Sequence, residues 1–168
     1  MLHKTKAYTL IELTVVVFLI GLILALTIPR VQHGLLTDDL KAATRRMIGT
    51  IKSLREMAVR DQRGYRLHFD MESNRYWIEW DTMTIEEQAE ARQNPSKLPV
   101  DVRILDICRP DTGKKDTGET AIYFTKKGYV EYAVIHLGTN NDRAHTIVLS
   151  PFMDTIKTYD GYVDIGTM

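Results

Sequence analysis

A single carboxylate, that of Glu12, lies near the start of a long apolar segment. From Tyr8 to Ile28 the chain has 21 residues, and Glu12 is the only charged one. A carboxylate in the hydrocarbon region of a membrane costs about 2.5–3.5 kcal/mol away from the interface, and such groups usually face a partner. The segment contains no Lys, Arg or His, so we expect a cation from another chain. An α-amino group freed by cleavage just before Tyr8 would be such a cation.

Patterns typical of catalysis are weak elsewhere in the chain. Gly113–Thr120 has the two-glycine spacing of a phosphate-binding loop, but Glu119 stands where such a loop needs its lysine. The five histidines lack zinc-binding spacing, and no Gly-x-Ser-x-Gly motif is present. The one cysteine, Cys108, forbids an intramolecular disulfide and is expected to be a small, partly buried apolar residue. We therefore expect no catalytic residue, metal or cofactor, with calcium in the Asp-rich loops as the alternative.

The apolar segment has the length and flanking charge of a membrane helix. About 20 mostly apolar residues cross a bilayer core. Lys4 and Lys6 precede the segment and no acid does, which favours a cytoplasmic N-terminus and an exported remainder. A secretory signal peptide would have a shorter apolar region and an Ala-x-Ala site. The other alternative is a plain single-pass anchor whose Glu12 snorkels to the interface.

The residues after the apolar segment predict an amphipathic helix over 30–63. Its apolar positions recur every three or four residues, which places them on one face; they are Leu36, Leu40, Ala43, Met47, Ile51, Leu54 and Ala58. Pro29 lacks an amide proton and is expected to kink the helix between its two halves. Gly64 is expected to end it.

The rest of the chain predicts an antiparallel sheet. Residues 65–70 and 75–80 form a hairpin pattern, and 81–99 predict a solvated loop or short surface helix. Further strands are predicted at 100–108, 121–125, 129–137, 145–149, 155–159 and 162–165, with a loop at 109–120, one hairpin turn at Asn140-Asn141 and another at Asp160-Gly161. The fold class is therefore α+β, a long N-terminal helix packed on an antiparallel sheet.

Residues Lys6-Ala7-Tyr8-Thr9-Leu10-Ile11-Glu12 resemble the class III signal of type IV pilins and type II secretion pseudopilins. The resemblance implies that a prepilin peptidase cleaves between Ala7 and Tyr8 and N-methylates Tyr8. It also implies that Glu12 pairs with the N-terminal amine of a neighbouring subunit, and that Pro29 is the family's helix-kinking proline. Ala7 replaces the usual Gly, and Tyr8 the usual Phe.

The head sequence is similar to the H-type minor pseudopilin and FimT group. The similarity lies in Tyr65-Arg-Leu-x-Phe, Arg75-Tyr-Trp, Leu98-Pro99, Ser150-Pro151-Phe152 and Asp160-Gly161. Together the two resemblances imply a leader at 1–7, a transmembrane assembly helix at 8–29 and a periplasmic, β-rich head at 64–168.

These resemblances imply a structural subunit of the type II secretion pseudopilus, in the inner membrane and periplasm, rather than an enzyme. Its expected partners are other pseudopilins, the prepilin peptidase, the inner-membrane assembly platform and membrane lipid. A minor type IV pilin of the FimT or FimU kind is the alternative, and a membrane-tethered binding or catalytic domain is a third. Some FimT-like proteins bind DNA, but from Pro151 onward Lys157 is the only basic residue against three aspartates, so we expect no nucleic acid partner.

Overall fold

The computed structural model describes residues 10–151 and 155–164, and the side chains of residues 24–38 lie outside that description. The chain divides into two compact units, Met1–Thr37 and Asp38–Met168. The elements in chain order are α1 (Leu10–Asp61), β1 (Tyr65–Asp70), β2 (Arg75–Trp80), α2 (Ile85–Gln93), β3 (Ser96–Lys97), β4 (Val102–Arg109), β5 (Gly113–Lys115), β6 (Glu119–Phe124), β7 (Ala133–Thr139), β8 (Ala144–Leu149) and β9 (Lys157–Asp160). The α+β class is confirmed.

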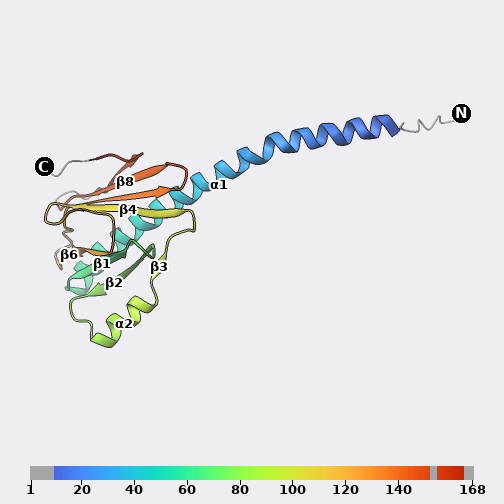
Figure 1. Cartoon of the computed structure of the whole chain (residues 1–168). Coiled ribbons are helices and arrows are strands. Elements are labelled where there is room, and N and C mark those ends of the chain that lie inside the picture. Colours follow the sequence, from blue (N-terminus) through green and yellow to red (C-terminus); the bar gives the residue numbers. More distant parts are fainter. Residues whose placement is uncertain (1–9, 152–154, 165–168) are drawn as a thin grey trace, which may run out of the picture. The chain divides into compact units, whose positions relative to one another are not determined.

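Helix α1 runs through both units (Figure 1), and Glu12 lies in its first turn. Across the described residues, no helix combines the length and the apolar character needed to cross a membrane. The predicted apolar face of the second half is confirmed, because its described members are all 2% exposed or less: Leu40, Ala43, Met47, Ile51, Leu54 and Ala58. The side chain of Leu36 lies outside the described part.

The head contains two antiparallel sheets where the sequence predicted one. The first has the order β3-β2-β1-β6 and the second β5-β4-β7-β8-β9. Figure 1 shows β1 and β2 in one layer and β4 and β8 in another. Both sheets and the buried face of α1 contribute to one hydrophobic core, in which Leu67, Phe69, Ile135 and Ile147 are fully buried.

The two predicted hairpins are confirmed. Strand β1 pairs with β2 in register from Tyr65 opposite Trp80 to Asp70 opposite Arg75. Strand β7 pairs with β8 across the turn that contains Asn140. The predicted short surface helix is α2, which begins with a capping box between Thr84 and Glu87.

The predicted final hairpin is wrong. Strand β9 pairs with β8 instead, and residues 161–164 form no strand. The chain leaves the sheet edge at Gly161, whose φ of 97° favours glycine. Thr146 on β8 then holds the segment, because its hydroxyl donates to the Gly161 carbonyl and accepts from the Val163 amide.

Other segments also differ from the sequence-based expectations. The predicted loop at 109–120 contains the edge strand β5, which pairs with the end of β4. Strand β7 begins at Ala133 rather than at residue 129, although Val130 still forms an isolated bridge with Phe124.

Gly64 does not end α1 in the way predicted. The helix ends at Asp61, and the left-handed residue after it is Gln62, with φ of 53°. Gly64 instead leaves room for a contact between two elements. A Cβ there would overlap the Tyr123 hydroxyl and the Asp81 carboxylate, which form a 2.8 Å hydrogen bond.

We expect Gly64→Ala to lower the free energy of unfolding by about 1–3 kcal/mol, because the added methyl group must displace this pair. The matched control is Gly49→Ala, since nothing lies within 4 Å of a Cβ at Gly49 in mid-helix. That change should raise stability by about 0.5–1 kcal/mol. Urea titrations followed by fluorescence of Trp77 and Trp80 measure both variants. Equal effects of the two substitutions would contradict the crowding at Gly64.

Candidate functional site

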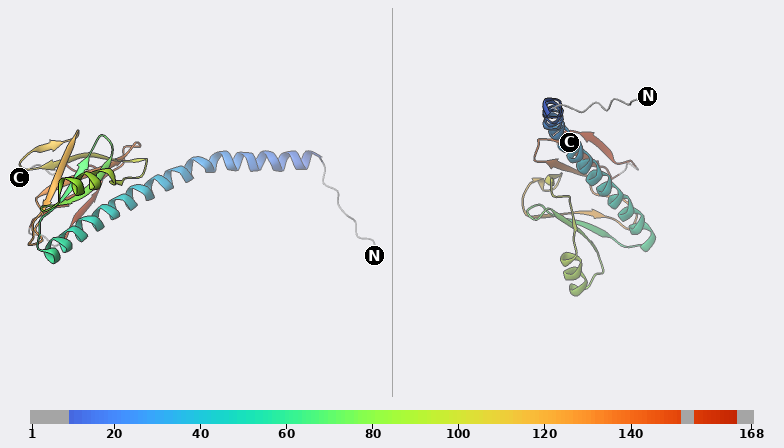
Figure 2. Two further views of the ribbon diagram at one scale, coloured as in Figure 1. Left: turned by 90° about the horizontal axis from the view of Figure 1, so that it is seen from below. Right: turned by 90° about the vertical axis from the view of Figure 1, so that its right-hand side faces the viewer.

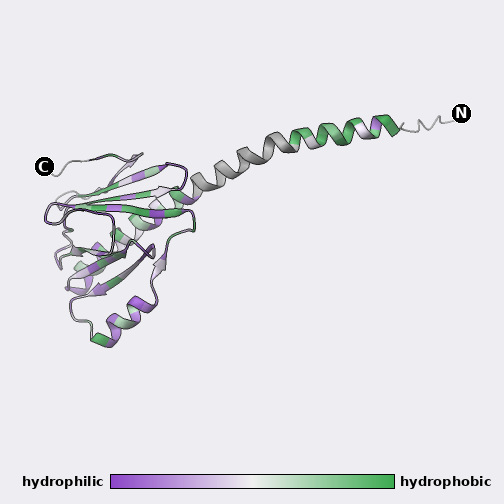
Figure 3. Cartoon of the chain, viewed as in Figure 1, coloured by the Kyte–Doolittle hydropathy of each residue, from purple (hydrophilic) through white to green (hydrophobic). Residues whose placement is uncertain are grey.

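The first described turns of α1 present an apolar surface on all sides. Every described side chain from Leu10 to Ile23 is exposed, and Phe18 is 69% exposed. Figure 3 shows these turns coloured almost entirely as hydrophobic. A helix that is apolar all round is typical of a buried or membrane environment, and large exposed apolar surfaces mark interaction sites. This segment is therefore the candidate assembly surface.

Glu12 lies in the first turn of α1, within the candidate assembly surface. A carboxylate there is stabilised by the helix N-terminus, where the partial charge of the backbone is positive. Thr14 is the nearby polar side chain, and its hydroxyl donates to the Ile11 carbonyl at 2.8 Å, so it is satisfied within the helix. Chemically, the surface offers apolar contact for another helix together with one anionic group.

The other sequence-predicted site residues are placed only in part. Ala7 and Tyr8 lie outside the described residues. Pro29 lies within α1, but its side chain is outside the described part, so the kink stays a prediction.

The head contains a buried polar network that sequence reasoning did not assemble. Asp106 on β4 and His136 on β7 are 2% and 1% exposed, and His136 Nδ1 lies 2.6 Å from Asp106 Oδ1. The second ring nitrogen, Nε2, lies 3.0 Å from the Val163 carbonyl. The ring of Tyr162 stacks on His136 at 4.0 Å, and its hydroxyl donates to Asp106 at 3.0 Å. We call these groups the C-terminal latch, because they hold residues 162–163 against the second sheet.

The network keeps Asp106 ionised. Burial alone would raise the pKa of Asp106, but the hydrogen bonds from His136 and Tyr162 and the Lys114 ammonium at 3.3 Å outweigh it. The pKa of Asp106 is therefore held below its ordinary value. Lys114 also donates to the Tyr162 hydroxyl at 2.9 Å, which ties β5 into the latch.

A β-bulge explains why the sequence pattern did not reveal this network. The β4–β7 register shifts between Ile104 and Asp106. Simple alternation would place Ile104 and Asp106 on the same face of the strand, but the bulge turns Asp106 away from the core. Gly138 accommodates the bulge, because a Cβ there would lie 2.6 Å from a methyl carbon of Leu105.

Three metal-ligand types meet at the latch without forming an evident metal site. One ligand atom each from Asp106, Cys108 and His136 lies within 4.8 Å of the others. These atoms already hydrogen-bond within the network, and the adjacent Lys114 charge opposes a cation. Burial and the nearby Asp106 charge raise the pKa of Cys108 to about 11, which favours the unreactive thiol.

The other described histidines lie in separate places. His68 on β1 stacks on Trp77 at 5.1 Å, in the first sheet. His145 on β8 lies 3.0 Å from the Thr44 hydroxyl of α1. The glycine-spaced segment at 113–120 forms β5, a turn and the start of β6.

Acidification is expected to destabilise the head through His68 and His145. Burial lowers the pKa of both rings below the ordinary value of 6.5, despite Glu79 beside His68 and Asp160 beside His145. The unfolded chain therefore binds more protons just below pH 6.5, so stability falls as pH drops through that window. Urea titrations between pH 7.5 and pH 5 measure the slope, which His145→Asn should reduce. A slope that is unchanged in this variant would contradict the assignment to His145.

Comparison with known proteins shows which solved structures share this fold. No sequence-family model matches the chain, and no curated protein matches it. Two solved structures of the minor pseudopilin EpsH from the type II secretion system of Vibrio cholerae are similar. One has a TM-score of 0.54 at 14% identity, covering 76% of this chain and 98% of EpsH. The other has a TM-score of 0.50 at 13% identity, covering 73% and 97%. The chain therefore has the fold of the EpsH minor pseudopilin, as its sequence resemblance implied.

Proposed function

We propose that this chain is a minor pseudopilin of a type II secretion system, a structural subunit rather than an enzyme. The observation that carries the proposal is the combination of an EpsH-like fold with an exposed apolar helix that begins at Leu10 and bears one carboxylate. A filament subunit needs both parts, a head and a helix that packs against other helices.

Maturation is the first step of the proposed role. Prepilin peptidase cleaves between Ala7 and Tyr8 and methylates the new amine of Tyr8. Ala7 has the small side chain that the position before the cut requires, and Tyr8 is aromatic. The leader 1–7 and its two lysines are removed, which leaves 161 of the 168 residues with 20 basic and 22 acidic side chains.

The mature helix then holds the subunit in the inner membrane until assembly. Residues 8–29 cross the membrane with the N-terminus in the cytoplasm, and the head lies in the periplasm. The assembly platform transfers the subunit into the pseudopilus, where its helix joins those of other pseudopilins. Movement of that filament helps to export proteins across the outer membrane.

In the filament, the helices exclude lipid and water from one another. The carboxylate of Glu12 pairs with the methylated amine of Tyr8 from a neighbouring subunit. Such a pair neutralises two charges that would each be costly in an apolar bundle. It also fixes the stagger between adjacent helices, because only one register brings the two groups together.

A deletion of the gene in its host, complemented by the intact chain, tests the function. We expect secreted enzymes to accumulate in the periplasm of the deletion strain and their export to return on complementation. Unimpaired export together with loss of surface pili would support the minor type IV pilin of the FimT or FimU kind instead. A small-molecule shift in melting temperature without either defect would favour a tethered binding domain.

A further inference from the structure

The C-terminal latch contains a histidine whose two ring nitrogens both face hydrogen-bond acceptors. His136 Nδ1 lies 2.6 Å from Asp106 Oδ1, and Nε2 lies 3.0 Å from the carbonyl oxygen of Val163. Among the described residues, Asp106 is the only buried acid and His136 the only buried histidine. None of the steps proposed for cleavage, membrane insertion or assembly uses this pair.

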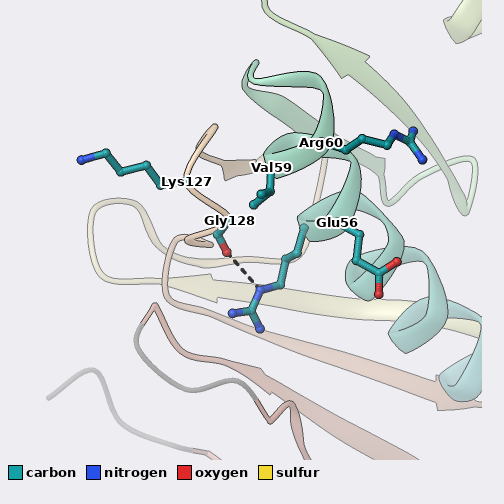
Figure 4. Close-up of a pocket in the computed structure, with 6 residues that line it drawn as sticks. Glu56, Val59, Arg60, Lys127 and Gly128 are labelled. Carbon is teal, nitrogen blue, oxygen red and sulfur yellow. Dashed lines mark hydrogen bonds between the residues drawn. The ribbon is translucent and has the colours of Figure 1, made fainter.

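The exposed features of the described head are different in kind. Helix α2 stands out from the rest of the head and buries none of its residues (Figures 1 and 2). In the hollow between the last turns of α1 and the turn at Lys127-Gly128, Arg60 and Lys127 point to opposite sides (Figure 4). Arg60 pairs with Asp61 at 2.9 Å, and Arg55 Nε donates to the Gly128 carbonyl at 3.1 Å. Only at the latch do buried charged groups face one another among the described residues.

The two contacts of the His136 ring together determine where its protons are. A backbone carbonyl can only accept a hydrogen bond, so Nε2 beside Val163 carries a hydrogen. An ionised carboxylate also only accepts, so Nδ1 beside Asp106 carries a hydrogen as well. The neutral ring has one donor and one acceptor, whereas the positively charged ring has two donors. The geometry therefore fits the positively charged form of His136.

The surroundings of the ring support this charge. Asp106 Oδ2 accepts from the Tyr162 hydroxyl at 3.0 Å and lies 3.3 Å from the Lys114 ammonium, which keeps the carboxylate ionised. The ring of Tyr162 stacks on His136 with centroids 4.0 Å apart, and the face of an aromatic ring attracts a cation.

The other charged or titratable groups at the latch act in both directions. The Lys114 ammonium opposes a positive ring, whereas the Asp106 carboxylate at 2.6 Å favours it. Cys108 Sγ lies 3.5 Å from Asp106 Oδ1, and Asp164 brings a second carboxylate near Cys108. The direct contact with Asp106 is the shortest of these interactions.

We propose that the positively charged form of His136 closes the C-terminal latch, and that the latch opens when this ring loses one of its two protons. The neutral ring has a single N–H group for two acceptors. Hydrogen bonds to a charged partner are the stronger ones, so the ring keeps Asp106 and releases the Val163 carbonyl. Residues 162–163 then lose one of the bonds that hold them to the second sheet.

The expected pH dependence of the latch is opposite to that of the whole head. Histidine rings change charge between about pH 5 and pH 8. The latch is closed at the acidic end of this range and opens as the pH rises. His68 and His145, in contrast, lower the stability of the whole head in acid. The latch is therefore measured locally, at its own ring and its own backbone amide.

Heteronuclear NMR of the histidine rings in the full chain, kept in detergent, tests the charge directly. We expect two ring N–H groups on His136 at about pH 5 and one at about pH 9. Hydrogen exchange of the Val163 amide, which donates to the Thr146 hydroxyl at 3.0 Å, reports the opening. At each pH its rate is compared with that of an unstructured peptide. We expect protection to fall about tenfold as the ring loses its proton, because a hydrogen bond to a charged group is lost.

Asp106→Asn separates the proton from the shape of the latch. The Asn amide can donate to Nδ1 of a neutral ring, while Nε2–H keeps its bond to the Val163 carbonyl. We expect a singly protonated ring and a Val163 amide whose protection does not change with pH. His145→Asn on β8 is the matched control, because it removes another histidine of the same sheet. It should leave the pH profile of Val163 exchange unchanged.

A His136 ring with one proton at every pH in the intact chain would overturn the proposal. So would a Val163 amide whose protection follows pH equally in the intact chain and in Asp106→Asn. If Asp106→Asn does not fold, the ring spectra of the intact chain still decide. The latch lies within the head, so failure of this test is separate from failure of cleavage, export or assembly.

Discussion

Glu12→Ala is expected to leave cleavage and membrane insertion intact and to remove the subunit from the pseudopilus. The variant has no carboxylate to meet the Tyr8 amine of its neighbour, which would then be buried without a partner. Breaking a buried ion pair in this way costs about 3–5 kcal/mol, equivalent to a more than hundredfold loss of incorporation. Sheared filaments, probed for the subunit beside the membrane fraction, give the measurement.

Thr14→Ala is the matched control for this experiment. It removes a polar group from the same turn of α1, but the Thr14 hydroxyl bonds only to the Ile11 carbonyl of its own helix among the contacts described. We expect normal incorporation of this variant. Equal incorporation of Glu12→Ala and the unaltered chain would refute the pairing role of Glu12.

Asp106→Ala is expected to lower the free energy of unfolding by about 3–5 kcal/mol, because it removes one partner of a buried polar network. The substitution leaves His136 buried without its anion and deprives the Tyr162 hydroxyl and Lys114 of an acceptor. It also removes the hydrogen bond that holds Tyr162 to β4, so the C-terminal segment should become more sensitive to protease. Urea titration measures the loss of stability, and limited proteolysis measures the exposure of the C-terminal segment.

Asp160→Asn supplies the control for Asp106. The Asp160 side chain is 96% exposed and lies 3.4 Å from His145. An exposed pair of this kind contributes about 0–1 kcal/mol. The double variant Asp106→Ala with His136→Ala should cost less than the sum of the single changes, because the two residues form one pair. Strict additivity, or equal effects of Asp106→Ala and Asp160→Asn, would contradict the C-terminal latch.

The elements with strong local periodicity could be predicted from the sequence. Apolar residues at helical spacing fixed the buried face of α1 from Leu40 to Ala58. Alternation and a short turn fixed the β1–β2 hairpin, in which Leu67 and Phe69 point into the core as expected. In these segments, each residue's surroundings follow from its near neighbours in the chain.

The C-terminal latch depended on contacts that the sequence does not display. Asp106 and His136 are 30 residues apart, and the bulge at Leu105 reverses the face that alternation would assign to Asp106. Residues 161–164 do not form the second strand of the predicted hairpin. The side chains of Thr146 and His136 bind this segment instead. Likewise, Gly64 does not end the helix. It leaves room for the side chains of Tyr123 and Asp81, which are distant in the sequence.

For the assembly site, the sequence motif predicts which residues act, and the structure shows the surface around Glu12. The motif predicts Ala7, Tyr8, Glu12 and Pro29 by resemblance, and these roles stay predictions. The structure adds that the turns around Glu12 are exposed and apolar on every side.

The intact mass of the protein extracted from host membranes tests the central claim most directly. We predict a chain that begins at Tyr8 and carries one N-methyl group, and an unprocessed chain in a strain that lacks the prepilin peptidase. A Met1 terminus in cells with active peptidase would contradict the account.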